Sequence, residues 1–412
     1  MTHLETADPE IARLIDHERV RLEETLNLIA AENHMPAAVL ETMGSVLNTK
    51  TIEGYPGKRF HAGCIHVDAV EALAVERGRI VFGAEHVNVQ PHSGTSANLA
   101  VYFAVLDVGD RILAMKLAHG GHLSHGHPAS ITGRCFDFRH YSVDPKTELI
   151  DYDQVQRLAG EFKPRMIVAG ASSYPRCIDY VRMAEIARSV SAYLLVDMAH
   201  LAGLVAAGVI PSPVPFSDFV TFTGYKTLMG PRGGVILCRA PFASMIDRTI
   251  FPGCQGTSAV NLIAAKALIF KLAGEKAFIA TQAQTVKNAA YLAGALADRG
   301  YRIVTGGTDN HLVLVDAGAR QLDGGTVEKL LESVGIIANR NVIPGDEDRP
   351  GTVSGVRFGT AAVTTRGMGT AEMDAIAGLI DRTLTVGRDR SALDKISEQV
   401  AALCKQFPIY TH

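Results

Sequence analysis

Short apolar runs alternate with amphipathic stretches through the middle of this chain. The runs at residues 166–170, 193–197 and 219–223 are almost continuously apolar, as strands are when both faces of their sheet are covered. Residues 180–190 carry apolar positions at helical spacing between the first two runs. Buried strands separated by helices predict an α/β fold with a mainly parallel sheet covered by helices.

Amphipathic segments also occupy the two ends of the chain. Apolar residues from 9 to 29 lie among charges, which predicts one or two helices in an arm of the kind that packs on a partner subunit. A helix over 259–273 is expected to lead to a second unit, where helices over 286–299 and 327–334 accompany two strands. We therefore predict three parts: an N-terminal helical arm (1–30), a large domain (31–280) and a smaller C-terminal α/β domain (281–412).

Composition narrows the class of protein. The 412 residues exceed the size at which one core usually keeps growing, and 47% hydrophobic with 20% charged residues is ordinary for a globular protein. A net charge of -3 without long runs of one sign gives no reason to expect nucleic acid or membrane as a partner. The six cysteines form no CxxC pair, and no apolar run approaches the ~18 residues of a membrane span. We expect a cytoplasmic protein.

Lys226 is the candidate nucleophile. It lies between the apolar run 219–223 and a second run at 233–238, so we expect it on a loop between two buried strands. A lysine amine is protonated near its normal pKa of about 10.4, but desolvation or a nearby cation lowers that pKa enough for Schiff-base formation. The alternative is a solvated surface lysine followed by a glycine-rich turn.

Polar residues follow the other predicted strands. Ser172 comes after one strand, and Asp197 and His200 end the next, so their side chains should face the same cleft as Lys226. An acid that closes a Leu-Leu-Val run is costly to bury without a cation. Residues 93–95, Ser-Gly-Thr, precede an apolar helix, where free N–H groups hold phosphate but ordinary N-caps look the same.

Three further segments carry candidate chemistry. The turn-rich loop 53–59 combines an acid, a phenol and two cations, which suits either a site or a solvated turn. Three histidines lie within residues 118–125, but no adjacent cysteine or carboxylate completes a metal set, so no metal site is predicted. Arg357 on a predicted strand suits either a substrate carboxylate or an internal salt bridge.

Together these motifs resemble the serine hydroxymethyltransferase family. The resemblance covers nearly the whole chain and implies the pyridoxal-phosphate (PLP) fold type I, with a mostly parallel seven-stranded sheet in the large domain and a smaller C-terminal α/β domain. The matching motifs, in chain order, are Leu28-Ile-Ala-Ala-Glu-Asn33, Glu53-Gly-Tyr-Pro-Gly-Lys-Arg59, Gln90-Pro-His-Ser-Gly94, Ala118-His-Gly-Gly-His-Leu123, Val196-Asp-Met-Ala-His200, Lys226-Thr-Leu228, Gly230-Pro-Arg-Gly-Gly234 and Thr308-Asp-Asn-His-Leu312.

The resemblance also implies roles for individual residues. Lys226 would form the internal aldimine with PLP, Asp197 would pair with the pyridine nitrogen, and His122 would stack on the ring and join the catalytic residues. A carboxylate there keeps the pyridinium protonated as an electron sink. The remaining cofactor contacts that it implies are Ser93, Gly94, Thr95, Ser172, His200, Thr223 and Gly256.

Substrate residues are implied in the same way. Glu53 corresponds to the acid–base residue and Tyr55 lies in the same catalytic loop, whereas Arg357 corresponds to the carboxylate-binding arginine. The family forms dimers whose sites borrow residues from both subunits, so we expect a homodimer or a tetramer. The remaining positions belong to the substrate pocket (Ala31 and His61) and to the tetrahydrofolate contacts (Leu123 and Asn341).

The chain departs from the family pattern around the substrate. Family members usually carry Ser at Ala31, Tyr at Thr51, two tyrosines at Phe60-His61 and Thr-His at Gly224-Tyr225. The expected reaction is reversible Cα–Cβ cleavage of a β-hydroxy-α-amino acid, with serine and tetrahydrofolate as the leading pair. An α-methylserine hydroxymethyltransferase, a threonine aldolase or transaldolase of specialised metabolism, and a non-catalytic PLP-binding paralogue remain the alternatives.

Overall fold

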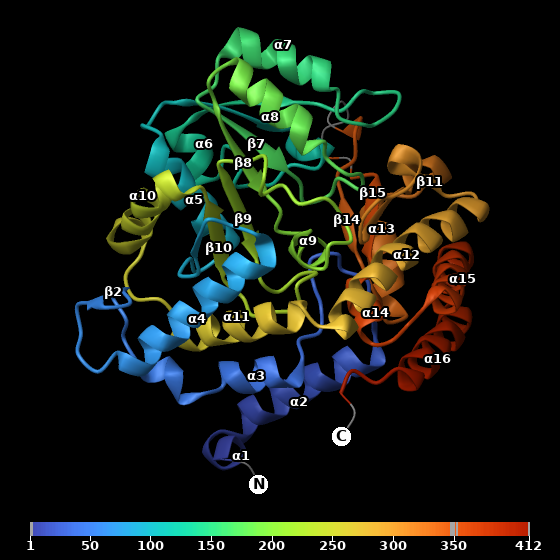
Figure 1. The fold of residues 1–412 in the computed structure, drawn as a ribbon. Helices are drawn as coiled ribbons and strands as arrows, with labels where there is room; N and C mark the ends of the chain where they lie inside the picture. Colours follow the sequence, from blue (N-terminus) through green and yellow to red (C-terminus); the bar gives the residue numbers. More distant parts are fainter. Residues whose placement is uncertain (1–2, 347–350, 352, 411–412) are drawn as a thin grey trace.

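A seven-stranded sheet forms the centre of the computed structural model, which describes residues 3–346, 351 and 353–410 (Figure 1). The strand order is β4-β10-β9-β8-β7-β5-β6, parallel from β9 to β6, with β10 antiparallel to both β9 and β4. The predicted fold class is thereby confirmed. The strands are β4 His86–Asn88, β5 Arg111–Met115, β6 Asp137–Tyr141, β7 Met166–Gly170, β8 Tyr193–Asp197, β9 Phe219–Thr223 and β10 Gly234–Cys238.

The central strands β7, β8 and β9 are almost entirely buried because helices cover both of their faces. Neighbouring residues point to opposite sides, so Ile167 packs into the core beneath one set of helices and Val168 into the core beneath the other. Buried residues of α5 (Gly94–Val105) and α10 (Ala243–Arg248) cover the second side. The first side is covered by α4 (Ile65–Phe82), α7 (Tyr152–Phe162), α8 (Tyr180–Ser189), α9 (Ala202–Ala206) and α11 (Val260–Ala273).

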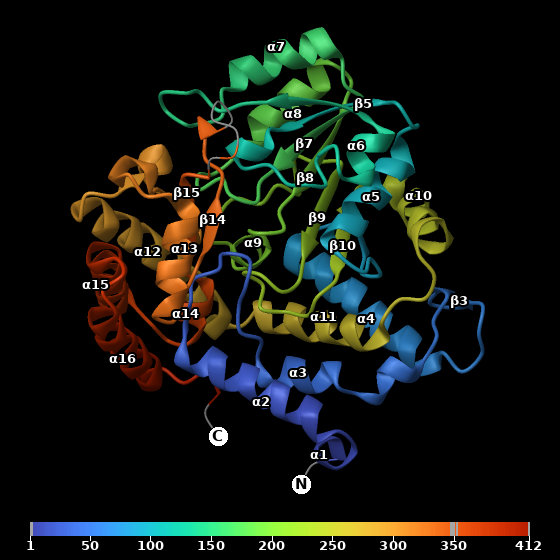
Figure 2. The ribbon, with the colours of Figure 1, turned by 180° about the vertical axis from the view of Figure 1, so that it is seen from behind.

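A second, antiparallel sheet lies beside the first (Figures 1 and 2). Its order is β11-β12-β15-β14, and its apolar residues share a core with five helices and with Leu26 and Leu28 of the N-terminal segment. The elements are β11 Arg302–Ile303, β12 Leu312–Asp316, β14 Asn339–Asn341, β15 Gly355–Gly359, α12 Lys276–Asp298, α13 Gly324–Ser333, α14 Ala361–Thr365, α15 Thr370–Val386 and α16 Arg390–Gln406.

The N-terminal arm is helical, as predicted. After α1 (His3–Ala7), α2 (Pro9–Glu24) begins with Asp8 accepting hydrogen bonds from two backbone N–H groups, and no residue of α2 is buried. The strand β1 (Leu26–Asn27) then pairs with β13 (Ile336–Ile337) in a separate two-stranded sheet, and Leu26 and Ile336 join the core beside the smaller sheet. Both views show α2 at the bottom of the molecule, near α3 (Ala37–Met43).

Some boundaries differ from those predicted. The helix expected from residue 286 begins ten residues earlier, because α11 ends at Ala273 with Gly274 as its C-cap and α12 starts at Lys276. The edge strand β6 carries exposed Asp137, Arg139 and His140, so it lacked the apolar signal that revealed its neighbours. The predicted domain limits stay a prediction. In the described part of the chain, no helix is long and apolar enough to cross a membrane.

Candidate active site

A cavity opens where β7, β8 and β9 end, at the edge of the sheet where ligands of parallel sheets bind. Its empty volume is about 420 Å³. It brings together most of the residues that the sequence assigned to one cleft. Its lining consists of Gly94, Thr95, His122, Ala171, Ser172, Asp197, Ala199, His200, Thr223, Tyr225 and Lys226.

Lys226 reaches this cavity from the turn between β9 and β10. Close backbone contacts shape the turn, since the N–H of Gly230 donates to the carbonyl of Gly224 at 2.7 Å. The lysine side chain is only 7% exposed, and no hydrogen bond to its Nζ lies among the described residues. Burial lowers the pKa of Lys226 to about 8, Asp197 opposes that shift, and Arg357 adds to it. The amine is therefore partly neutral, and nucleophilic, near neutral pH.

Asp197 is a buried carboxylate with a dedicated set of donors. Oδ2 accepts hydrogen bonds from Asn98 Nδ2 at 2.8 Å and from His125 Nε2 at 3.1 Å, and Oδ1 accepts one from the N–H of Ala199 at 3.0 Å. Burial alone would raise the pKa of Asp197, but His125, His122 and Asn98 together hold it below its usual range. The group stays charged and suits a cationic ring nitrogen.

Two of these donors, Asn98 and His125, were not among the site residues predicted from the sequence. Asn98 lies inside the apolar helix α5, and a polar residue on its buried face was the sequence feature that could have indicated a role in the site. It also accepts a hydrogen bond from Thr221 at 2.6 Å. His125 was noted only as one of three clustered histidines. Both contacts depend on residues far apart in the sequence.

His122 presents a neutral ring to the cavity. Burial lowers the pKa of His122 to about 4, and its Nδ1 lies 2.7 Å from Ser124 Oγ. The ligand atoms of His122, His125 and Asp197 all lie within 4.8 Å of one another, which is a grouping compatible with a metal ion. His122 and Asp197 line the cavity, and His125 is bonded to Asp197 from behind it, so we assign the three residues to the surroundings of this cavity and propose no metal for them.

A cradle for an anion borders the cavity at the N-terminus of α5. Ser93 caps the helix, its Oγ accepting from the N–H of Ser96 at 3.0 Å, so Gly94 and Thr95 present their backbone to the cavity. A Cβ atom at Gly94 would lie 2.6 Å from Cγ2 of Thr223. Thr223 Oγ1 is buried without a hydrogen-bond partner in the described structure. Free helix N–H groups and an unpaired hydroxyl together suit a phosphate.

The smaller sheet contributes two residues beside the cavity. Arg357 on β15 donates from Nη1 to the carbonyl of Ser172 at 2.6 Å and forms no ion pair with an acid in the described residues. Burial lowers its pKa to about 10, so the guanidinium remains charged. His311, not among the predicted site residues, lies with Nε2 3.4 Å from Nδ1 of His200 and 3.0 Å from the carbonyl of Ala30.

Other predicted residues gather elsewhere. Glu53, Tyr55 and His61 lie on or next to the hairpin of β2 (Gly54–Tyr55) and β3 (Lys58–Arg59), and none of them lines the cavity. Glu53 Oε2 is 3.8 Å from His61 Nε2, and a Cβ atom added to Gly256 would lie 3.6 Å from Glu53 Oε1. The hydroxyl of Tyr55 donates to the carbonyl of Asp247 at 2.6 Å. These residues form a cluster of their own.

The substrate and folate candidates are dispersed. Ala31 is half-buried. Its neighbour Ala30 packs closely against Gly359 of β15, where an added Cβ atom would clash with it. Leu123 is 53% exposed. Asn341 lies on β14 and donates from Nδ2 to the carbonyl of Val342 at 2.6 Å. Their predicted roles stay predictions.

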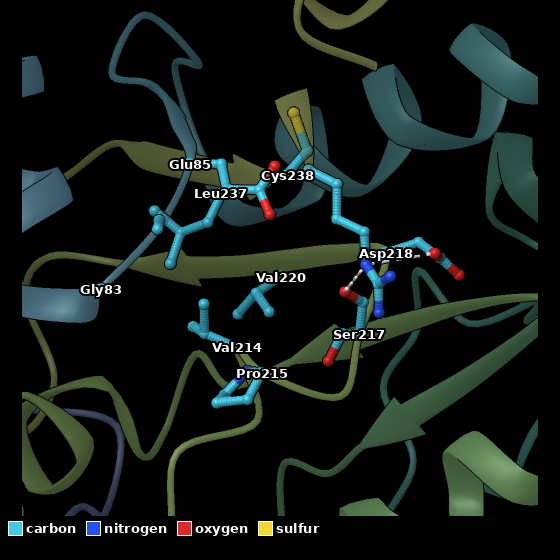
Figure 3. A pocket seen from close by; sticks show the side chains of 11 residues that line it. Gly83, Glu85, Val214, Pro215, Ser217, Asp218, Val220, Leu237 and Cys238 are labelled. Carbon is cyan, nitrogen blue, oxygen red and sulfur yellow. Dashed lines mark hydrogen bonds and ion pairs between the residues drawn. The ribbon is translucent and has the colours of Figure 1, made fainter. Parts of the chain in front are cut away.

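A second cavity lies at the other end of β9 and β10 (Figure 3). There Arg239 donates from Nε to the carbonyl of Ser217 at 3.1 Å and lies near Asp218. Burial, with Asp247 and Glu85, raises the pKa of Cys238 to about 12, so its thiol is a poor nucleophile. This cavity contains none of the predicted site residues.

The seven-stranded sheet, the buried lysine after β9 and the charged acid that ends β8 define an α/β protein of fold type I with its ligand cavity at the carboxyl ends of the strands. A family model described as serine hydroxymethyltransferase matches residues 4–380. The chain belongs to this family, whose members are typically PLP-dependent enzymes.

Proposed function

We propose that the protein is a PLP-dependent enzyme that reversibly cleaves the Cα–Cβ bond of a β-hydroxy-α-amino acid, with serine and tetrahydrofolate as the leading substrates. The observation that carries this proposal is the buried pair in one cavity: Lys226, with a lowered pKa, and Asp197, held charged. An anion cradle completes the cavity. No other described cavity combines these three features.

The residues of the cavity fit PLP. The α5 N-terminus and Thr223 would hold the phosphate, Asp197 would hold the ring nitrogen, and neutral His122 would lie against the ring. When bound, PLP supplies an electron sink that stabilises negative charge at Cα. Lys226 would provide the amine that holds the cofactor.

Arg357 is proposed to bind the substrate carboxylate. Its guanidinium is charged, lacks an acidic partner in the described structure and is fixed by Ser172 and Asn339 from two sides. A planar guanidinium binds a carboxylate through two parallel hydrogen bonds, which orients the substrate as well as attracting it. The bond to Ser172 places this cation beside the cavity of Lys226.

A partner subunit is proposed to complete the site. Glu53 and Tyr55 lie outside the cavity of their own chain, and α2 leaves apolar side chains uncovered, with Ile15 57% exposed. Phe60, next to the hairpin, is 75% exposed. Apolar residues exposed on both segments support a homodimer in which the hairpin of each chain reaches the cavity of the other.

Mixed dimers test this arrangement. Glu53→Gln should reduce turnover by at least about a hundredfold, the scale of losing a general acid–base group, and Lys226→Ala by at least about a thousandfold, since it removes the nucleophile. Co-expressed in one cell, the two inactive chains should regain about a quarter of the wild-type activity, because half of the dimers carry one intact site. Glycine formation from serine measures this recovery. A mixture as inactive as its parents would contradict a shared site.

The substrate is tested by offering the PLP-loaded protein L-serine, α-methyl-L-serine or L-threonine, each with and without tetrahydrofolate. Folate-dependent formation of glycine from serine is expected. Failure on serine with turnover of another amino acid would replace the leading substrate.

One structural feature favours a changed substrate as the second candidate. Tyr225 replaces the family's histidine before the lysine, lines the cavity and lies beneath Arg232, whose Cζ is 4.5 Å from the ring centroid. Together with Ala31 and Thr51 it supports α-methylserine or threonine as the alternative amino acid, through the same bond cleavage.

A further inference from the structure

Lys266 is a second buried lysine, near the anion cradle but outside the cavity. It lies in the middle of α11 and is 2% exposed. Its Nζ donates to the carbonyl of Val89 at 2.6 Å and to that of Gly234 at 2.9 Å. No ion pair of Lys266 lies among the described residues. A buried ammonium whose bonded partners are neutral carbonyls is costly unless its charge serves another group.

The two carbonyls belong to the backbone that builds the cradle. Val89 follows β4 and leads through Pro91 to Ser93 and α5, and the N–H of Gly234 donates to the carbonyl of Pro91 at 2.8 Å. Gly234 is also the register partner of Thr223, which contacts Gly94 in the cradle. Lys266 therefore lies directly behind the backbone on which the α5 N-terminus and Thr223 are held.

The acid that acts on the pKa of Lys266, Glu71, is already paired. Glu71 accepts from Arg59 Nη2 at 2.6 Å and from Gln90 Nε2 at 2.7 Å. Burial lowers the pKa of Lys266 to about 7, and Glu71 only partly opposes this shift. The surroundings leave the positive charge poorly compensated, and an anion in the cradle would compensate it.

We infer that Lys266 is a cofactor-positioning residue, which places a positive charge behind the cradle and so favours a ligand with an anionic group there. The inference rests on the proposed function, since PLP is the ligand in question. It predicts a preference for PLP over pyridoxal, which has the same ring and aldehyde but no phosphate, that depends on the charge of Lys266.

The experiment titrates the apo-protein with PLP and with pyridoxal and follows the visible absorbance of the bound ligand. Lys266→Met removes the charge and the donor, whereas Lys266→Gln removes the charge but keeps a donor for the carbonyls. Lys271→Met, an exposed lysine on the same helix, is the matched control. Both Lys266 variants should bind PLP about tenfold more weakly, the scale of one charge acting through protein, and pyridoxal within about twofold of wild type.

The inference would be overturned if both ligands bound equally more weakly, if the preference for PLP were unchanged, or if the Gln variant restored PLP affinity. In each case, tethering of the backbone would be enough to explain why Lys266 is buried. Failure of both variants to fold, with the control intact, would overturn it in the same way. A wild-type protein that binds no PLP would contradict the proposed function itself, so the two failures are distinguishable.

Discussion

Replacing Lys226 by alanine is expected to reduce the rate of glycine formation by at least about a thousandfold, the largest effect predicted for any single residue. The side chain supplies the only buried amine that lines the described cavity, and no neighbouring group can replace it as a nucleophile. The protein should still fold, because Lys226 Nζ makes no hydrogen bond in the described structure that its loss would break. Steady-state assays and the absorbance of bound cofactor measure both effects.

The pH dependence of the apo-protein provides an independent test of the same amine. Burial lowers the pKa of Lys226 to about 8, and only the neutral amine attacks an aldehyde. The rate at which PLP binds covalently should therefore rise as pH increases through about 8 and level off above it. A rate still rising steeply at pH 10 would show an unshifted lysine, and Lys271→Ala, which removes an exposed lysine, should leave the profile unchanged.

Replacing Asp197 by asparagine is expected to lower kcat by about a thousandfold, while most of the fold stability is retained. Asparagine preserves the shape, and its oxygen can still accept a hydrogen bond from the N–H of Ala199, but its amide NH2 replaces the oxygen that accepts from Asn98 and His125, and it removes the charge that would keep a ring nitrogen protonated. The measurements are kcat with saturating cofactor, the absorbance spectrum and the thermal midpoint.

Asp218→Asn is the control for this substitution. Asp218 lies at the opposite end of the sheet, where its Oδ2 accepts a hydrogen bond from the N–H of Leu194 at 2.9 Å. Its replacement should leave kcat within about twofold, as expected for a residue far from the chemistry. Equal losses in the two variants would mean that Asp197 acts through stability alone, and the proposed role would be withdrawn.

Local patterns of hydrophobic and polar residues predicted much of the fold. The runs that became β7, β8 and β9 were almost continuously apolar, and an amphipathic helix was expected between the first two, so strand identity and a mainly parallel sheet followed from short windows. The positions of Ser172, Asp197 and Lys226 followed as well, because the carboxyl ends of parallel strands share one edge. Family motifs then gave these residues roles that periodicity alone leaves open.

Only the tertiary structure determined the contacts between segments that are distant in the sequence. Asn98 and His125 meet Asp197 across 99 and 72 positions of sequence, and Lys266 reaches Val89 across 177. The separation of the Glu53 hairpin from the cavity likewise appears in no local pattern. Hydrophobic periodicity reports which face of an element is buried, whereas these contacts depend on which elements become neighbours, and that follows from strand order and helix packing over the whole chain.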